Sequence, residues 1–328
     1  MKNKILKSLM MLCAVLGAAV FFSGCGEKKD GKITFVLDWT PNTNHTGLFV
    51  AQEKGYFKEA GLDVDIIQPS EDGSTMMVAS GRVEFGVGFQ DTMASAIAGS
   101  EPMDLVAVAA LIQHNTSGII SLKEKGIDTP AKLEGAKYAT WDSPVEIATI
   151  KKIMERDGGD FSKLQLIPST VYDVVTALHT DIDCIWIFYA WDGVKMDISG
   201  YDSNYLDFRM IDETFDYYTP VILSNQKYLK NHGAEAKKFL KAVRRGYEYA
   251  VENPDEAAEI LCKAAPELDR DLVFASQNWI SKQYKAEVEQ WGYIDPVRWN
   301  RFYRWLNTLD GLDLNLPDNY GFTNEYLN

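Results

Sequence analysis

The segment between residues 33 and 67 limits the fold of this chain more than any other. Apolar residues alternate from Ile33 to Leu37, which predicts a buried strand that ends at Asp38 and Trp39. A polar loop with a proline follows, then an expected helix from residue 46 to Gly55 and a short strand over residues 63–67. In open α/β sheets, ligands bind beyond the carboxyl ends of the strands. The sequence therefore predicts an α/β fold with a ligand-facing loop after residue 37.

A second unit of the same kind starts at residue 137. The strand expected over residues 137–140 ends at Trp141, and Ser143 and Glu146 have the spacing of a helix capping box, with Pro144 at the first helical position. A helix N-terminus with free amides is therefore expected beside Trp141. The residues leave two explanations open: a helix cap alone, or a cap that also forms one wall of a ligand site.

Two further strands end in side chains suited to ligand binding. One is expected over residues 83–89 and ends at Gln90 and Asp91; the other is expected over residues 182–188 and ends at Tyr189, Trp191 and Asp192. Glycines at positions 86 and 88 fit tight packing of a strand against a helix better than close approach of a ligand.

The chain is too long for one hydrophobic core. About 300 residues follow the N-terminal segment, and strands alternate with helices throughout, so two α/β lobes are expected. We expect residues 33–122 plus 224–328 to form the first lobe and residues 123–223 to form the second. Two crossings between lobes define a cleft that can close on a ligand. Aromatic residues within 299–306 recur at helical spacing, so we assign them to the core and not to the site.

The first 24 residues have the composition of a signal peptide. Lysines precede an apolar stretch over residues 9–22, and the small residues Ser23 and Gly24 precede Cys25. We expect cleavage before Cys25, acylation of this cysteine and a polar tether over residues 25–32. The apolar stretch is too short for a permanent transmembrane helix. The predicted location is the extracytoplasmic side of the cell membrane, with a lipid anchor at Cys25; an ordinary signal peptide is the alternative.

The chain is acidic, with a formal net charge of −14 at pH 7. Removal of residues 1–24 takes away three lysines and no acidic residue, which changes the net charge from −14 to −17. Nucleic-acid binding is not expected, because no basic stripe is present. Cys184 and Cys262 are expected to be free and buried, since one lies in an apolar strand pattern and the other in a helical pattern. The histidines are scattered, so no metal site is predicted.

Several of these motifs resemble those of the solute-binding lipoproteins of ABC importers, above all the branch that binds thiamine-pyrimidine precursors. The resemblance covers nearly all of residues 32–325 and rests on the segments 38–47, 55–57, 79–81, 85–87 and 191–193. It implies a type II periplasmic-binding-protein fold and an ABC permease as partner. It also implies that an aminopyrimidine, of the formylaminopyrimidine or hydroxymethylpyrimidine type, stacks between aromatic rings while a carboxylate binds its amino edge. We expect a monomer that needs no cofactor.

The expected ligand site consists of polar and aromatic residues at the strand ends. The resemblance places Trp39, Tyr189 and Trp191 at the aromatic positions, and Asp192 where relatives often have a glutamate. No arginine lies in these loops, which favours a flat, polar ligand without negative charge. Another heterocycle such as a flavin, or a small sulfonate, stays open. The predicted ligand-binding residues are Asp38, Trp39, Asn44, His45, Gln90, Asp91, Trp141, Ser143, Glu146, Tyr189, Trp191 and Asp192.

The same resemblance extends to the yeast-type pyrimidine synthases. These enzymes use a lysine for pyridoxal phosphate and a nearby histidine that is consumed. The corresponding positions are Gly88 and Thr92, and no Ser, His and Asp arrangement typical of a nucleophile is recognisable. The sequence therefore predicts a binding protein without catalytic residues; a pyrimidine-forming synthase is the alternative of another class.

Overall fold

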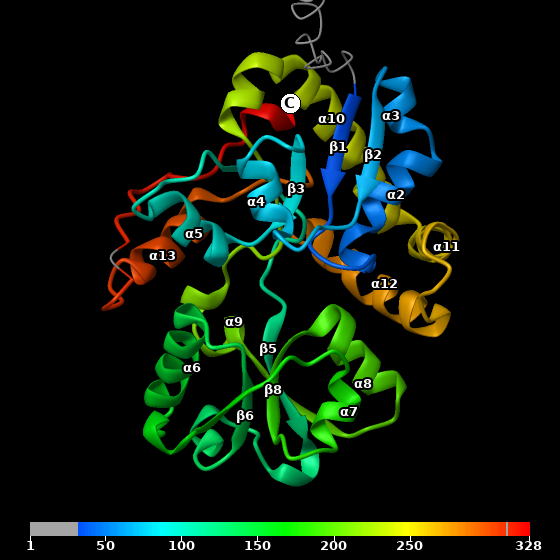
Figure 1. Ribbon diagram of the computed structural model, residues 1–328. Coiled ribbons are helices and arrows are strands. Elements are labelled where there is room, and N and C mark those ends of the chain that lie inside the picture. The colour runs from blue at the N-terminus through cyan, green and yellow to red at the C-terminus, as the bar shows by residue number, and fades with distance from the viewer. Residues whose placement is uncertain (1–31, 313) are drawn as a thin grey trace, which may run out of the picture. The chain divides into compact units, whose positions relative to one another are not determined.

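The first sheet of the protein has five strands, one of which comes from much later in the chain. The computed structural model describes residues 32–312 and 314–328. The strand order is β2-β1-β3-β10-β4, and Figure 1 shows β1, β2 and β3. Strand β1 is parallel to β3, and β10 is antiparallel to both of its neighbours. The strands are β1 (Lys32–Val36), β2 (Asp63–Ile67), β3 (Phe85–Gly88), β4 (Val106–Ala110) and β10 (Val221–Ser224).

Helices pack on both faces of this sheet because the strand side chains alternate between them. Phe35 belongs to one buried cluster together with Phe239, whereas Val36 belongs to another that contains Trp299 and Phe302. The predicted alternation after residue 33 and the assignment of the late aromatic residues to the core are thus confirmed. The helices are α2 (Thr46–Glu53), α3 (Tyr56–Glu59), α4 (Gly73–Ala79), α5 (Gln90–Ala98), α10 (Gln226–Glu252), α11 (Pro254–Ala264), α12 (Arg270–Lys285) and α13 (Pro296–Leu306).

The second sheet is built from one continuous stretch of the chain. Its strand order is β7-β6-β8-β5-β9, and β5 is antiparallel to both β8 and β9. The strands are β5 (Ser117–Leu122), β6 (Lys137–Thr140), β7 (Gln165–Pro168), β8 (Cys184–Phe188) and β9 (Ser203–Asp207). The helices are α6 (Pro144–Arg156), α7 (Val174–Leu178), α8 (Val194–Ile198), α9 (Phe208–Ile211) and the π-helix η5 (Tyr189–Gly193). The short 3-10 helices are η1 (Thr43–His45), η2 (Lys123–Lys125), η3 (Pro130–Leu133), η4 (Phe161–Lys163), η6 (Glu213–Phe215) and η7 (Glu325–Leu327).

The expected arrangement of two α/β lobes is confirmed, but two strands belong to a different lobe than expected. Residues 117–122 were expected in the first lobe, yet β5 pairs with strands of the second sheet. Residues up to 223 were expected in the second lobe, yet β10 lies between β3 and β4. Both strands are fully buried, so their composition shows that they are core strands without showing which sheet they complete.

A charged cluster joins the two segments that cross between the sheets. His114 precedes β5; its Nδ1 lies 2.8 Å from Oδ2 of Asp216, which precedes β10, and its Nε2 lies 2.8 Å from Oε2 of Glu287. Arg298 lies 2.9 Å from Glu287 and 3.5 Å from Asp216. The hydrogen bond with Asp216 raises the pKa of His114 above its usual value of 6.5, against the opposing effects of burial and Arg298.

Helices α2 and α10 approach each other closely at a pair of glycines. A methyl group added at Gly246 would lie 2.0 Å from the carbonyl oxygen of Gly47, and one added at Gly47 would lie 2.3 Å from the ring of Tyr247. Only glycine permits this approach of two backbones. The contact fixes α2, and therefore also the loop over residues 38–45 that precedes it.

Two predictions about helix ends are confirmed. Gly55 follows α2 with a φ of 73°, and Ser143 and Glu146 form the expected capping box of α6. Cys184 is free and buried, as expected, whereas Cys262 is free but only partly buried, so the expectation of a buried thiol is wrong at that position. Within residues 32–312 and 314–328, no helix is long and apolar enough to cross a membrane, and no group of three or more His, Cys, Asp or Glu could hold a metal ion. The predicted signal peptide and the lipidation site at Cys25 lie outside the described residues.

Candidate functional site

The loop after β1 is held by hydrogen bonds within itself. The side chain of Asn42 accepts a hydrogen bond from the backbone N–H of Asn44 at 2.9 Å and so caps η1. The fully buried ring of His45 accepts from the backbone N–H of Asn42 through Nδ1 at 3.2 Å, and its Nε2 lies 2.7 Å from Oδ1 of Asp38. The loop presents the side chain of Asp38, which is 15% exposed, and Trp39, which is 47% exposed.

Strand β8 runs directly into the π-helix η5, which carries three of the predicted residues. The hydroxyl of Tyr189 donates to Asp197 at 2.7 Å. Trp191 packs against the hydrophobic core of the first lobe. Burial raises the pKa of Asp192 to about 6, although Lys195 acts in the opposite direction. Single π-helical turns occur often at functional sites, and this one sets three candidate side chains at a strand end.

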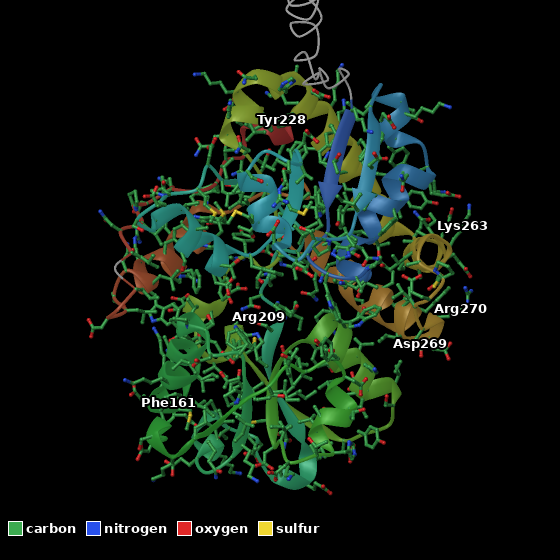
Figure 2. All side chains as sticks on the ribbon, in the orientation of Figure 1. Phe161, Arg209, Tyr228, Lys263, Asp269 and Arg270 are labelled. Atoms are coloured by element: carbon green, nitrogen blue, oxygen red, sulfur yellow. The ribbon has the colours of Figure 1, made fainter. Side chains whose placement is uncertain are left out.

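Helix α12 connects the loop after β1 with η5. The Oγ atoms of Thr43 and Ser276 lie 2.6 Å apart, and the Ser276 hydroxyl donates to the carbonyl oxygen of Ala190. Serine has one hydroxyl proton, so Thr43 must be the donor to Ser276. One turn along α12, the ring of Trp279 lies 5.2 Å from the ring of Tyr189. Asp269 caps this helix, which begins at Arg270 (Figure 2).

The roles of Ser276 and Trp279 were not found from the sequence. Their spacing of three residues places both on one face of a helix, and this is the one local signal that they act together. The partners of Ser276, which are Thr43 and Ala190, lie 233 and 86 positions away in the chain, so no local pattern reveals these contacts.

The end of β3 lies near the end of β8. Phe89 directly follows β3, and Phe188 is the last residue of β8. Their rings are nearly parallel, with centroids 6.2 Å apart. Gln90 uses both amide atoms within the protein: Nε2 donates to the carbonyl of Trp299 at 3.0 Å, and Oε1 accepts from the backbone N–H of Tyr218 at 2.9 Å.

Asp91, at the first turn of α5, has a buried polar atom without a partner. Its Oδ1 makes no hydrogen bond to any described residue. Burial raises the pKa of this carboxyl to about 6. The backbone N–H groups of Asp91 and Thr92 act against this rise in pKa, so the carboxylate is stabilised in part while Oδ1 is left without a partner.

At the end of β6, one predicted residue is exposed and another is enclosed. Trp141 is 54% exposed and makes an edge contact with Trp186, with ring centroids 5.3 Å apart. Glu146 accepts hydrogen bonds from the hydroxyl groups of Tyr138 at 2.6 Å and Thr140 at 3.0 Å, and from the backbone N–H of Ser143 at 3.2 Å. Burial raises its pKa. The capping box of α6 at Ser143 and Glu146 is thus confirmed. That Trp141 also forms part of a ligand site stays a prediction.

The structure divides the predicted set into two groups. His45, Gln90 and Glu146 are buried with their polar atoms engaged by the protein, so they hold backbone segments in place and are not open to a ligand. Gln90 lies just after β3, whereas His45 lies in η1 and Glu146 in α6, so only Gln90 is at a strand end, and the sequence could not show which way these side chains face. The remaining predicted residues keep some exposed surface: Asp38, Trp39, Asn44, Asp91, Trp141, Ser143, Tyr189, Trp191 and Asp192.

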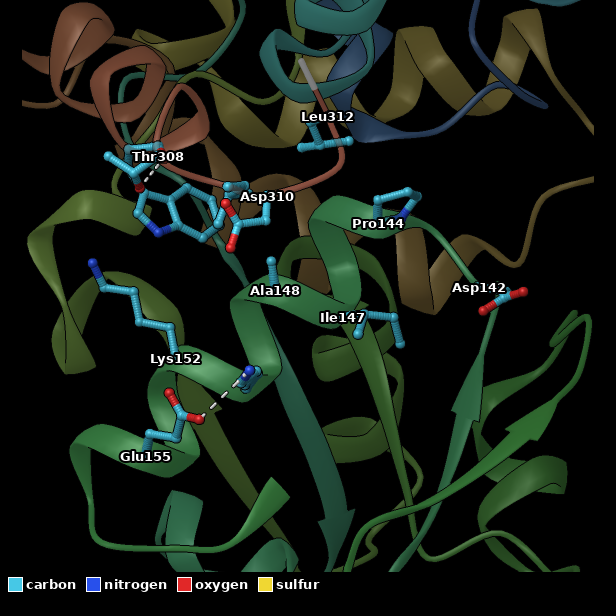
Figure 3. Close-up of a pocket in the computed structure, with 12 residues that line it drawn as sticks. Asp142, Pro144, Ile147, Ala148, Lys152, Glu155, Thr308, Asp310 and Leu312 are labelled. Atoms are coloured by element: carbon cyan, nitrogen blue, oxygen red, sulfur yellow. Dashed lines mark hydrogen bonds and ion pairs between the residues drawn. The ribbon is translucent and has the colours of Figure 1, made fainter. Parts of the chain in front are cut away.

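A separate groove of about 610 Å³ lies between α6 and the segment after α13 (Figure 3). Lys152 and Glu155 of α6 line one side, and Trp305 and Asp310 line the other. Figure 3 shows Asp142 at one end of the groove. No residue of the predicted ligand-binding set lines this groove, although Asp142 and Pro144, which line it, adjoin Trp141 and Ser143 in the chain.

Comparison with known proteins identifies the family. A model of the family described as NMT1/THI5 like matches residues 42–257, more than half of the chain. The chain belongs to the NMT1/THI5-like family. This confirms the resemblance to pyrimidine-related proteins that the motifs around Asp38 and Trp191 indicated.

Relatives of this NMT1/THI5-like chain include a binding protein and enzymes. The formylaminopyrimidine-binding protein of Halalkalibacterium halodurans is 27% identical over 95% of this chain and 96% of its own length. The 4-amino-5-hydroxymethyl-2-methylpyrimidine phosphate synthase THI11 of Saccharomyces cerevisiae is 27% identical over 90% of this chain and 88% of its own length. Among solved structures, the periplasmic aliphatic sulphonate binding protein SsuA of Escherichia coli matches with a TM-score of 0.61 and 14% identity, covering 75% of this chain and 82% of that one. This last likeness shows the two-lobed fold of periplasmic binding proteins.

Proposed function

We propose that the chain is the extracytoplasmic solute-binding protein of an ABC importer and that it captures a thiamine-related aminopyrimidine. The relative from Halalkalibacterium halodurans, which matches nearly the whole chain, supports the binding role and the class of ligand. An anchor at Cys25 and an ABC permease as partner complete the proposal. Labelling with a radioactive fatty acid tests the anchor: the label is expected on the wild-type protein and absent from Cys25→Ala.

The observation that carries the proposal is the exposure of two tryptophans at strand ends. Trp39 is 47% exposed and Trp141 is 54% exposed, although indole rings of this size are usually largely buried. Asp38 and Asp192 lie next to Trp39 and Trp191 in the chain and supply acceptors for the N–H groups of a heterocycle. Stacking is worth about 1–3 kcal/mol per ring and a hydrogen bond to a charged group about 1.5–3 kcal/mol. Two rings and one carboxylate give roughly 4–9 kcal/mol, against about 8 kcal/mol for micromolar affinity.

Titration of the protein with formylaminopyrimidine and hydroxymethylpyrimidine tests the ligand class. Binding is expected to change tryptophan fluorescence and to raise the melting temperature. If neither pyrimidine changes either signal, the ligand assignment is wrong, and a thermal-shift screen with flavins and small sulfonates separates the alternatives.

Substitution of the aromatic residues tests the site. Trp39→Ala is expected to weaken binding about 5- to 150-fold, the equivalent of one lost stacking contact. Trp191→Ala is expected to weaken binding and also to lower the melting temperature, because Trp191 packs against the first core. Trp305→Ala serves as the control, since Trp305 lies on α13 against Phe215, and should leave affinity unchanged.

The synthases among the relatives favour a second candidate function, a pyrimidine-forming enzyme. The residues of this chain argue against it. Gly88 and Thr92 stand where the resemblance implies the lysine and the histidine, and a Cβ at position 88 would lie 2.3 Å from the side chain of Leu223. A lysine there would require Leu223 to move. An aldimine absorbance band after incubation with pyridoxal phosphate would support the hypothesis of a pyrimidine-forming enzyme. We expect no such band.

A further inference from the structure

The proton arrangement at His45 follows from its two partners. A backbone N–H can only donate, so Nδ1 of His45, which faces the N–H of Asn42 at 3.2 Å, must be the acceptor. The ring proton therefore sits on Nε2, which lies 2.7 Å from Oδ1 of Asp38. The short helix η1, capped by Asn42, creates this geometry by turning His45 back beneath Asp38.

The hydrogen bond from His45 orients the carboxylate of Asp38. Oδ1 receives the Nε2 proton, and no described residue donates a hydrogen bond to Oδ2. The His45 side chain has no exposed surface, whereas that of Asp38 is 15% exposed. A ligand can therefore reach Asp38 but not the ring behind it.

We propose that His45 is a positioning residue, which fixes the Asp38 carboxylate so that Oδ2 accepts a hydrogen bond from an N–H group of a flat heterocycle lying near Trp39. This inference rests on the proposed function and adds a rule for the ligand. The ligand edge at Asp38 must donate a proton. A sulfonate or carboxylate at this place would meet a negative charge, which the neutral ring of His45 does not cancel.

Calorimetric titration with two pyrimidines tests the role of His45. The probes are formylaminopyrimidine and the matched pyrimidine that lacks the ring amino group. In His45→Leu, affinity for formylaminopyrimidine is expected to fall about 10- to 100-fold, the equivalent of one hydrogen bond to a charged group. Affinity for the matched probe without the amino group is expected to stay within about threefold of wild type.

His45→Gln is the matched control. A glutamine amide carries both an acceptor and an N–H donor, so this variant should restore most of the affinity for formylaminopyrimidine. Equal losses in the leucine and glutamine variants, or equal losses for both probes, would overturn the positioning role and leave only a structural one.

Two further measurements keep the inference testable if His45→Leu does not fold. The ring ¹⁵N shifts of wild-type His45 should show the proton on Nε2, and a proton on Nδ1 refutes the geometry. Asp38→Asn should reduce the preference for the aminated probe over the other; an unchanged preference contradicts the role of Asp38. If wild-type protein binds neither probe, the proposed function fails together with this inference, whereas binding without dependence on His45 removes the inference alone.

Discussion

The hydroxyl pair of Thr43 and Ser276 makes a quantitative prediction, because it links the loop after β1 with the π-helix after β8. Ser276→Ala removes two hydrogen bonds at once: Thr43 loses its acceptor, and the carbonyl of Ala190 loses its donor. Ser276 and Thr43 are fully buried or nearly so, so water does not replace these bonds without cost. A buried polar group left without a partner costs about 1–3 kcal/mol. We expect Ser276→Ala to lower the free energy of unfolding by about 2–4 kcal/mol.

Urea denaturation measures this loss, and hydrogen exchange shows where it acts. The amides of η5 are expected to exchange faster in Ser276→Ala than in wild type. The matched control is Ser281→Ala on the same helix, because the buried Ser281 hydroxyl bonds to the carbonyl of Ala250 in the first lobe. That variant should also lose stability, but without faster exchange in η5.

The reasoning is refuted if Ser276→Ala unfolds at the same urea concentration as wild type, or if both serine variants change exchange in η5 equally. A double-mutant cycle with Thr43→Val supplies a second check. Because the two hydroxyls share one bond, we expect a coupling energy of at least about 0.5 kcal/mol.

Three other predictions concern stability. Gly246→Ala should lower the free energy of unfolding by about 3 kcal/mol or more in urea denaturation, since the methyl would overlap the Gly47 carbonyl. Gly233→Ala on the same helix, with its nearest contact at 3.2 Å, should change this free energy by less than about 1 kcal/mol. Similar losses in the two variants would contradict the close approach of α2 and α10. His114 has a raised pKa in the folded protein, so its contribution to stability is fully present below pH 6.5 and is lost as pH rises through the folded pKa. The urea midpoint of the wild type should therefore fall over this pH range, and His114→Gln should remove that fall. An unchanged pH dependence in the variant would show that other groups produce it. Trp305→Ala should lower the free energy of unfolding by about 2–3 kcal/mol in thermal and urea unfolding, because the rings of Trp305 and Phe215 pack with centroids 5.0 Å apart. A variant as stable as wild type would show that this contact contributes little.

Much of the local structure could be predicted because the responsible signals lie within a few residues of one another. The alternation from Ile33 to Leu37, the stop at Gly55 and the capping box at Ser143 all depend on neighbours in the chain. The lobe assignment of β5 and β10 could not be predicted, because a fully buried strand looks the same in either sheet.

The site could be predicted only in part for a related reason. The predicted strand ends indicated where candidate residues lie, and Trp39 and Trp141, which follow β1 and β6, are exposed. The direction of a side chain depends on partners elsewhere: Gln90 is held by the backbone of Trp299, 209 positions away. A residue with several hydrogen-bonding atoms, such as His45, has the chemistry to bind either the protein itself or a ligand, and sequence spacing does not distinguish the two.

The position of β10 has a consequence for the order in which the lobes form during synthesis. All five strands of the second sheet lie between residues 117 and 207, so that sheet has every strand available before residue 221 is made. The first sheet cannot be completed until β10 is synthesised, because β10 lies between β3 and β4, which end more than a hundred residues earlier in the chain. Until then β3 has one unpaired edge and β4 lacks its neighbouring strand, and such edges recruit strands from other chains. A nascent chain that stalls before residue 221 therefore exposes the edges of its first lobe beside a second lobe whose strands are all present.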